Sequence, residues 1–303
     1  MAVWEESGQR MSGDESASSS ARRSRSNDSN VGRADLHLHT TFSDGALSPQ
    51  ELVQKAHQAG LSVIAVTDHD NVAAIDEAME WGKSVGVEVV PGLELSATMG
   101  EKDLHILAYF FDHKNQTLLD YLTFFRHERY KRAERIVEKL NKINVPLELE
   151  AVLEQAGVGS IGRPHIANAM VEQGFIDSYH EAFSKYIGVG GPAYEKKYQV
   201  SPQEAFQLIS KAGGLSFLAH PGKYTTELEL SELIDLGMDG IEVVHPSHDS
   251  NRQAFYRSVV DQYFLLESGG SDFHGGKKSD EYALGSFWVP LPVVDAMRKR
   301  LFR

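Results

Sequence analysis

From residue 34 onward, short runs of apolar and β-branched residues alternate with segments whose apolar positions recur at helical spacing. Such alternation is typical of an α/β fold in which helices connect parallel strands. We therefore expect a parallel α/β sheet or barrel. The predicted strands lie near residues 34–39, 62–67, 87–96, 104–110, 215–219, 240–244 and 263–267.

Two helix starts can be read directly from the sequence. The segments 48–51 and 201–204 both read Ser-Pro-Gln-Glu. Each places a capping Ser before a first-turn Pro, with a Glu three residues after the Ser. Gly60 supplies a stop signal for the first of these helices.

About 100 residues between Phe111 and Leu215 contain no convincing strand, which is too long for an ordinary connection. We predict an inserted helical subdomain over residues 113–213, within a barrel formed by 34–112 and 214–303. Its first helix spans about 117–143 and carries apolar residues at helical spacing. On the same helix lie Arg126, Arg129, Arg132 and Arg135. Either these arginines face an anionic substrate, or they form a solvated face paired with neighbouring glutamates, which is the simpler interpretation.

Composition narrows the class of protein. Thirty Lys and Arg stand against 43 Asp and Glu, and a net charge of -13 argues against non-specific binding of long nucleic acid. Without cysteine there is no disulfide, no thiolate nucleophile and no sulfur-ligated zinc. Residues 1–33 are Ser-rich and aperiodic, so we expect a disordered tail. No bilayer-spanning stretch or secretory signal is present, and a cytoplasmic location is expected.

Histidines and acids gather at strand ends, where α/β folds place their sites. In the first strand, alternation sends His37 and His39 to one face, and Leu36 and Leu38 to the other. A Ser-Asp-Gly turn follows and can fold the carboxylate of Asp44 back over the same site. One such histidine is usually a core side chain, but nine ligand-type residues predict a metal site with nitrogen and oxygen ligands. The nine are His37, His39, Asp44, His69, Glu94, His105, His220, Asp272 and His274.

The order and spacing of these motifs resemble the polymerase and histidinol phosphatase (PHP) family. The matching elements are His37-x-His39, Asp68-His69, Glu94 with His105, and Asp272-x-His274. The resemblance runs from about residue 34 to 290 and implies a distorted (β/α)7 barrel with a trinuclear metal site. It places one cation on His37, His39, Glu94 and Asp272. It places a second on Glu94, His105 and His220, and a third on Asp44, His69 and His274.

Such a site would suit phosphate chemistry. The positive charge of three divalent cations exceeds the negative charge of three carboxylates. The site would therefore attract phosphate although the chain as a whole is acidic. Metal-bound water ionises near neutral pH and supplies an attacking hydroxide. Imidazole and carboxylate ligands suit manganese, iron or zinc, and we expect manganese.

The segment Gly162-Arg163-Pro164-His165 places a guanidinium in a loop beside a helix start. From the residues alone, Arg163 either grips a phosphate or pairs with a nearby acid. The Gly-Arg-Pro-His element and the stretch from Ala212 to Pro221 are similar to those of the PHP subgroup that acts on nucleotides and short RNA. That resemblance implies that Arg163 binds a substrate phosphate, with His165 as a second candidate. His245 and His248 stay outside the metal set and either orient a ligand or touch substrate.

We therefore predict a metal-dependent phosphoesterase. Its reaction would be removal of the 3'-phosphate from nucleoside 3',5'-bisphosphates, or 5'-3' trimming of short 5'-phosphorylated RNA, or both. No long duplex, membrane or obligatory protein partner is expected. One alternative is a histidinol-phosphate phosphatase, which the large insert and its arginines disfavour. Another is a catalytically silent PHP module, which the complete ligand set disfavours.

Overall fold

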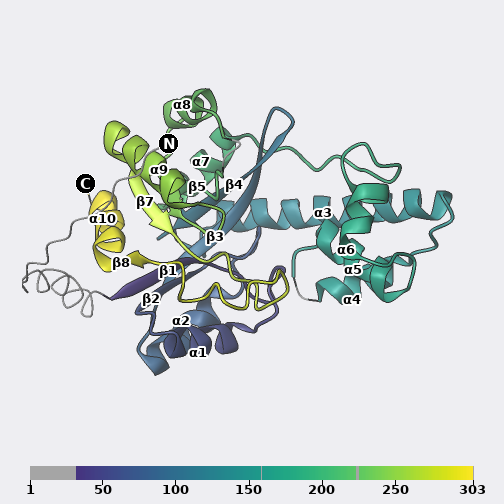
Figure 1. Cartoon of the computed structure of the whole chain (residues 1–303), viewed down its shortest axis with the longest axis horizontal. Helices are drawn as coiled ribbons and strands as arrows, with labels where there is room; N and C mark the ends of the chain where they lie inside the picture. Colours follow the sequence, from purple (N-terminus) through teal and green to yellow (C-terminus); the bar gives the residue numbers. More distant parts are fainter. Residues whose placement is uncertain (1–31, 158, 223–224, 303) are drawn as a thin grey trace, which may run out of the picture. The chain divides into compact units, whose positions relative to one another are not determined.

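The computed structural model describes residues 32–157, 159–222 and 225–302. Within these ranges one sheet has the strand order β7-β6-β5-β4-β3-β2-β1-β8 (Figure 1). The strands are β1 (Arg33–Leu38), β2 (Val63–Val66), β3 (Glu88–Met99), β4 (Lys102–Tyr109), β5 (Leu215–Leu218), β6 (Gly240–Val244), β7 (Leu266–Gly269) and β8 (Val289–Pro290). All seven predicted strands are present, and β8 is an addition. The predicted tail lies outside the described residues except for Gly32 and Arg33.

The sheet is mixed, so the parallel pairing expected from the sequence holds for only some of its neighbouring strands. Strand β4 runs antiparallel to both β3 and β5, and β8 runs antiparallel to β1, whereas the other neighbours are parallel. Strands β3 and β4 are longer than predicted because they form a hairpin in which Met99 pairs with Lys102. The turn between them holds Gly100 at a φ of 61°, a conformation that favours glycine.

The two ends of the sheet approach each other. Leu38 forms a parallel bridge to Phe273, just beyond β7, and the His39 N–H donates to the Phe273 carbonyl at 3.0 Å. A Cβ at Gly270 would lie 2.4 Å from the backbone nitrogen of His37, so the approach requires glycine there. The result is a nearly closed, distorted α/β barrel, as expected, with eight strands in place of seven.

Helices cover the barrel on both sides (Figure 1). Buried residues of α1 and α2 pack against β1 and β2, whereas α7, α8 and α9 contribute to a core with β3 to β6. Both Ser-Pro-Gln-Glu segments form capping boxes at helix starts, as predicted. No helix in the described ranges is long and apolar enough to cross a membrane. The helices are α1 (Pro49–Gln58), α2 (Ile75–Val85), α3 (Gln116–Lys142), α4 (Leu149–Ala156), α5 (Arg163–Glu172), α6 (Tyr179–Glu181), the π-helical η2 (Ala182–Ile187), α7 (Pro202–Lys211), α8 (Glu227–Asp235), α9 (Ser250–Tyr263) and α10 (Leu291–Leu301).

The long helix α3 joins two separate cores. Leu122 and Phe125 in its first half belong to the barrel core. Ile136 and Leu140 in its second half pack in another cluster, formed with α4, α5 and η2 and covering residues 133–193. Figure 1 shows α3 running from the strands to these helices. The boundaries 113–213 of an inserted subdomain stay a prediction.

Candidate metal centre and anion pocket

Strand β1 delivers two imidazoles to one place. Nε2 of His37 and Nε2 of His39 each lie 3.2 Å from Oε2 of Glu94. They lie 3.3 and 3.1 Å from Oδ1 of Asp272, which follows β7. The predicted convergence of the two histidines is therefore present, and Glu94 and Asp272 lie beside them.

Strand β1 is irregular beside these two histidines. The pairing of β1 with β2 shifts between Asp35 and Leu38. As a result Leu36 packs in the cluster that contains β4 and β5 residues, and Leu38 packs with α1 and α2. The expectation that these two leucines share a face is wrong, because a bulge re-aims the side chains beside it.

Glu94 is the hub of the cluster. It lies on β3, is 1% exposed and contacts five imidazoles. Three imidazole nitrogens lie 3.2 Å from its Oε2, and the other two lie 2.7 and 3.0 Å from its Oε1. The five, in the same order, belong to His37, His39, His69, His105 and His220.

The sequence pattern predicted His105 at a strand end. In the structure it lies in the middle of β4. Because β4 is antiparallel, His105 pairs with Ser96 and its ring faces Glu94 from across the hairpin. Its Nδ1 is 3.3 Å from Nε2 of His220. Glu94, His105 and His220 therefore lie close together, and the ligand-type atoms of Glu94 and His105 also form a group with His69.

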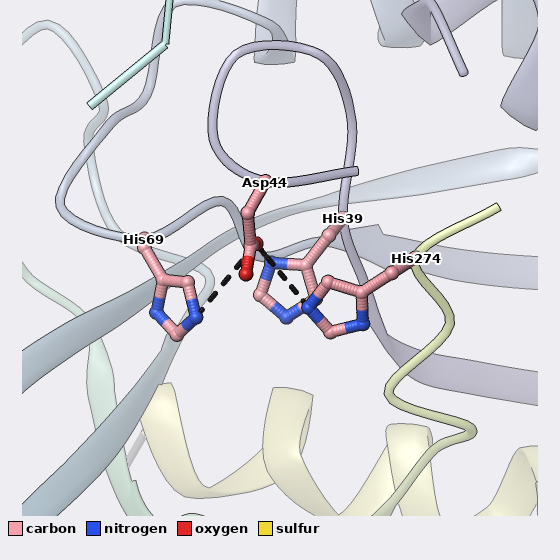
Figure 2. Close-up of side chains that lie close together, drawn as sticks. All are labelled: His39, Asp44, His69 and His274. Atoms are coloured by element: carbon pink, nitrogen blue, oxygen red, sulfur yellow. Dashed lines mark ion pairs between the residues drawn. The ribbon is translucent and has the colours of Figure 1, made fainter. Parts of the chain in front are cut away.

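Asp44 lies at the centre of another group (Figure 2). Its Oδ1 is 3.2 Å from Nε2 of His274, 3.8 Å from Nδ1 of His39 and 3.9 Å from Nε2 of His69. One ligand atom from each of these four residues lies within 4.8 Å of the others. The predicted set of Asp44, His69 and His274 is thus joined by His39. All nine predicted residues come together, and their roles as ligands remain a prediction.

The chemistry of these side chains fits divalent cations. Of the nine buried side-chain atoms that lack a hydrogen-bond partner among the described residues, four lie in this cluster, and such atoms are costly unless something else binds them. Burial lowers the pKa of His69 well below its ordinary value, which favours the neutral imidazole that binds metals. Burial raises the pKa of Glu94, but its histidine neighbours outweigh burial and hold that pKa well below its usual range. The four atoms are Nε2 of His39, Oδ1 of Asp44, Nδ1 of His69 and Nε2 of His245.

Two buried carboxylates support the cluster from behind. Glu242 on β6 lies with Oε1 2.8 Å from Nδ1 of His37, and its Oε2 accepts the His220 N–H at 2.6 Å. Asp68 accepts the Thr40 N–H at 2.8 Å and the Ser43 hydroxyl at 2.5 Å. Glu242 therefore orients the imidazole of His37 and holds the backbone of His220, and Asp68 holds the turn that carries Asp44. Glu242 was not among the predicted site residues, although an acid on a predicted buried strand was a usable signal.

Replacing Glu242 with Gln should lower kcat and the affinity for divalent cations by about 10- to 100-fold, because the carboxylate fixes the ring of His37. The matched control is Glu267→Gln on the neighbouring strand β7, where the carboxylate pairs with Arg257. Steady-state kinetics and metal titration of both variants check the expectation. Equal effects of the two substitutions would contradict the orienting role.

His245 and His248, which were left outside the predicted metal set, differ in their contacts. His248 uses both ring nitrogens, with Nδ1 2.9 Å from the Val243 carbonyl and Nε2 accepting the Gly222 N–H at 2.9 Å. It therefore holds the backbone around the site. His245 instead directs Nε2 toward Oδ2 of Asp272 at 3.5 Å. Of the two, His245 is the one that faces the metal cluster.

A cationic cavity opens beside the cluster. It shares His69 and His105 with the cavity that lies over Glu94 and Asp272. Its wall therefore continues from the candidate metal centre into the helical region. The cationic side chains that line it are Arg129, Arg132, Arg163 and Lys197.

Positive charge in this cavity is only partly neutralised. Asp103 lies 2.9 Å from Nζ of Lys197 and 3.8 Å from Nη2 of Arg163. Arg132 donates from Nε to the Glu195 carbonyl at 2.9 Å and has no carboxylate partner among the described residues. Burial, together with nearby arginines, lowers the pKa of Arg132 to about 10. An anion in this cavity would relieve that cost.

Arg129 and Arg132 on α3 do not form the solvated face that was predicted for the arginines of this helix. Both line the cavity and pair with other partners than the helix's own glutamates. Arg129 contacts the carboxylate of Asp70, and its Nη1 donates to the Ile161 carbonyl at 3.2 Å. Arg129 thereby ties the barrel to the loop before Arg163. The preferred reading of a solvated face paired with neighbouring glutamates is wrong for these two residues.

His165 lies at the start of α5 and lines the same cavity. Its Nδ1 accepts the Gly162 N–H at 3.0 Å, so the ring caps the helix. Burial lowers the pKa of His165 to about 4, which keeps the ring neutral at physiological pH. A role in substrate binding for His165 stays a prediction.

Comparison with known proteins gives consistent matches. The PHP domain model matches residues 35–193. The 5'-3' exoribonuclease of Haemophilus influenzae is 34% identical over 245 residues, which cover 79% of this chain and 89% of that protein. The 3',5'-nucleoside bisphosphate phosphatase of Chromobacterium violaceum is 30% identical over 246 residues, covering 79% of this chain and 86% of that protein. The crystal structure of a putative metal-dependent phosphoesterase from Bifidobacterium adolescentis has a TM-score of 0.80 and 31% identity, covering 88% of this chain and 96% of that one.

Proposed function

The chain belongs to the PHP-domain family, and on that premise we propose that it hydrolyses phosphate esters of nucleotides that carry a second, terminal phosphate. The substrates are nucleoside 3',5'-bisphosphates, which lose the 3'-phosphate, and short 5'-phosphorylated RNA, which is trimmed from its 5' end. Relatives named for both activities match most of the chain. The overall class is that of a metal-dependent phosphoric ester hydrolase.

One observation carries the substrate assignment. The cationic cavity is continuous with the metal cluster through His69 and His105. A nucleotide with two phosphates fits this arrangement, because one phosphate can lie in the cavity while the other reaches the cluster. Arg132 and Arg163 supply the charge that a terminal phosphate requires.

The cation ligands follow from the three groups of side chains. His37, His39, Glu94 and Asp272 would hold one divalent ion, and Glu94, His105 and His220 a second. Asp44, His69 and His274, with His39 beside them, would hold a third. We propose manganese, since nitrogen and oxygen donors suit it, with iron or zinc as alternatives. When bound, such ions supply an ionised water near neutral pH and positive charge for the phosphoryl oxygens.

The side chains of this chain set the geometry of the reaction. A water molecule loses a proton as its oxygen bonds to phosphorus, the bond from phosphorus to the ribose 3'-oxygen breaks, and that oxygen takes up one proton, so that no proton is gained or lost overall. Arg132 and Arg163 position the nucleotide by its terminal phosphate. Glu242 keeps His37 in its orientation. Since no side-chain nucleophile is needed, the absence of cysteine fits the reaction.

The alternative of a histidinol-phosphate phosphatase receives no support from the pocket. Histidinol phosphate carries an amino group, which the four cationic side chains of the cavity would repel. A catalytically silent module would be expected to lack ligands, whereas all nine ligand-type side chains converge here.

A substrate panel tests the proposal. Purified protein with manganese should release phosphate from adenosine 3',5'-bisphosphate and should shorten 5'-phosphorylated oligoribonucleotides. Histidinol phosphate should be a poor substrate, and the same RNA with a 5'-hydroxyl should be cut more slowly. Preferential hydrolysis of histidinol phosphate would contradict the proposal.

Manganese should also stabilise the folded protein. A ligand that binds only the native state at about 100 times its Kd adds about 2.7 kcal/mol to the free energy of unfolding. Thermal unfolding in excess manganese, compared with excess chelator, should show a higher Tm. His57→Ala, which alters an exposed histidine of α1, should keep the full shift, whereas His37→Ala should lose most of it. An equal shift in both variants would place the bound ion elsewhere.

A further inference from the structure

A lysine occupies one corner of the proposed metal centre. Lys278 lies in the loop after β7, with Nζ 2.6 Å from Nε2 of His274 and 3.1 Å from Oδ2 of Asp44. It also lines the cavity over Glu94 and Asp272. Its ammonium group is thus a tethered cation in contact with two of the predicted ligands.

Because of its tautomer, His274 can bind either Lys278 or a metal ion through Nε2, but not both. Nδ1 of His274 lies 2.6 Å from the backbone carbonyl oxygen of Asp272. Since a carbonyl oxygen only accepts, Nδ1 carries the ring proton, and Nε2 keeps a single lone pair. That lone pair can accept from the ammonium of Lys278 or bind a metal ion, but it cannot do both.

Distance and charge lead to the same conclusion. A zinc ion bound by an imidazole lies about 2.0–2.1 Å from its nitrogen, and Nζ of Lys278 stands 2.6 Å from Nε2 of His274. The ammonium and a metal ion would therefore compete for the space next to the same lone pair. A divalent ion and an ammonium that close together would also repel each other strongly.

We propose that Lys278 competes with a divalent cation for the corner formed by Asp44 and His274. The inference rests on the proposed metal centre. The chain then holds two cations tightly, and a third binds only when the ammonium swings away. Room for that movement exists, because the Lys278 side chain is 47% exposed. While it stays in place, the ammonium of Lys278 is the third cation of the centre.

Calorimetric titration of Mn²⁺ into the metal-stripped full-length chain tests the competition without measuring activity. The wild-type chain should bind two ions tightly and a third more weakly. Lys278→Met keeps the length of the side chain but removes its charge, and the third ion should bind about tenfold tighter or more. The control is Lys277→Met, which removes the same charge from the same loop, because Nζ of Lys277 donates to the Gly45 carbonyl at 3.0 Å.

Three outcomes would overturn the competition. The third-ion affinity could be the same in the wild type and Lys278→Met, or Lys277→Met could give an equal gain. The third outcome, that none of the proteins binds Mn²⁺, would also remove the metal centre itself. A failed substrate panel with intact Mn²⁺ binding would affect only the proposed substrates, so the two failures are distinguishable.

Discussion

Glu94→Gln should lower kcat/KM for adenosine 3',5'-bisphosphate by about 1000-fold or more, because one buried carboxylate contacts the imidazoles of two proposed ion sites. Both of its oxygens face imidazole nitrogens, and an amide presents only one oxygen to them. The variant should also bind fewer manganese ions per chain, measured by elemental analysis after gel filtration.

The matched control for this experiment is Glu88→Gln on the same strand. Glu88 is exposed and pairs with Arg298 at the other end of β3, so its loss should leave activity and metal content near the wild-type values. Circular dichroism should show that both variants are folded. If folded Glu94→Gln retains wild-type turnover, the cluster around Glu94 is not the catalytic centre.

Arg132→Ala should raise KM for adenosine 3',5'-bisphosphate by about 10- to 100-fold, the usual worth of a charge-assisted hydrogen bond. It should change hydrolysis of adenosine 3'-phosphate, which has no second phosphate, by about twofold at most. Arg163→Ala should behave in the same way. The reason is that both guanidinium groups line the cationic cavity and neither is a predicted metal ligand.

The control for the arginine variants is Arg135→Ala, one turn further along α3. Arg135 pairs with Glu195 and is 43% exposed, so its removal should affect neither substrate. Equal losses on the bisphosphate and the monophosphate in Arg132→Ala would contradict a role in binding the terminal phosphate.

Much of the site could be predicted because its residues follow strands. Strand ends are marked in the sequence by the change from an apolar run to polar residues. The Asp68-His69 pair after β2 follows that signal, and the His37-x-His39 element at the end of β1 was recognisable from strand alternation together with the other motifs. Placement at one edge of a sheet then brings such residues together.

The rest depends on tertiary contacts that no local pattern encodes. Arg129 and Arg132 look like part of a solvated helix face, because charged residues recur along α3 in either case. Contacts with distant segments fix them at the cavity, since Arg129 donates to the Ile161 carbonyl and Arg132 to the Glu195 carbonyl. The antiparallel β4 was also missed, since alternation of apolar and polar residues is the same in both strand directions.

Lys278 illustrates the same limit at the metal centre. It is separated from Asp44 by most of the chain, and nothing in the loop sequence indicates that their side chains meet. The supporting carboxylate of Glu242 is similar, because its partner His37 lies on a strand far away in the sequence. Such pairs of residues, far apart in the sequence, come into contact only in the folded barrel.

The most direct test of the account is the identity of the phosphate released from adenosine 3',5'-bisphosphate by the manganese-loaded protein. We predict adenosine 5'-phosphate as the product, with kcat/KM at least about tenfold above that for adenosine 3'-phosphate, because the cavity holds the 5'-phosphate while the cluster cleaves the other. Release of the 5'-phosphate, or equal rates on both substrates, would contradict the account.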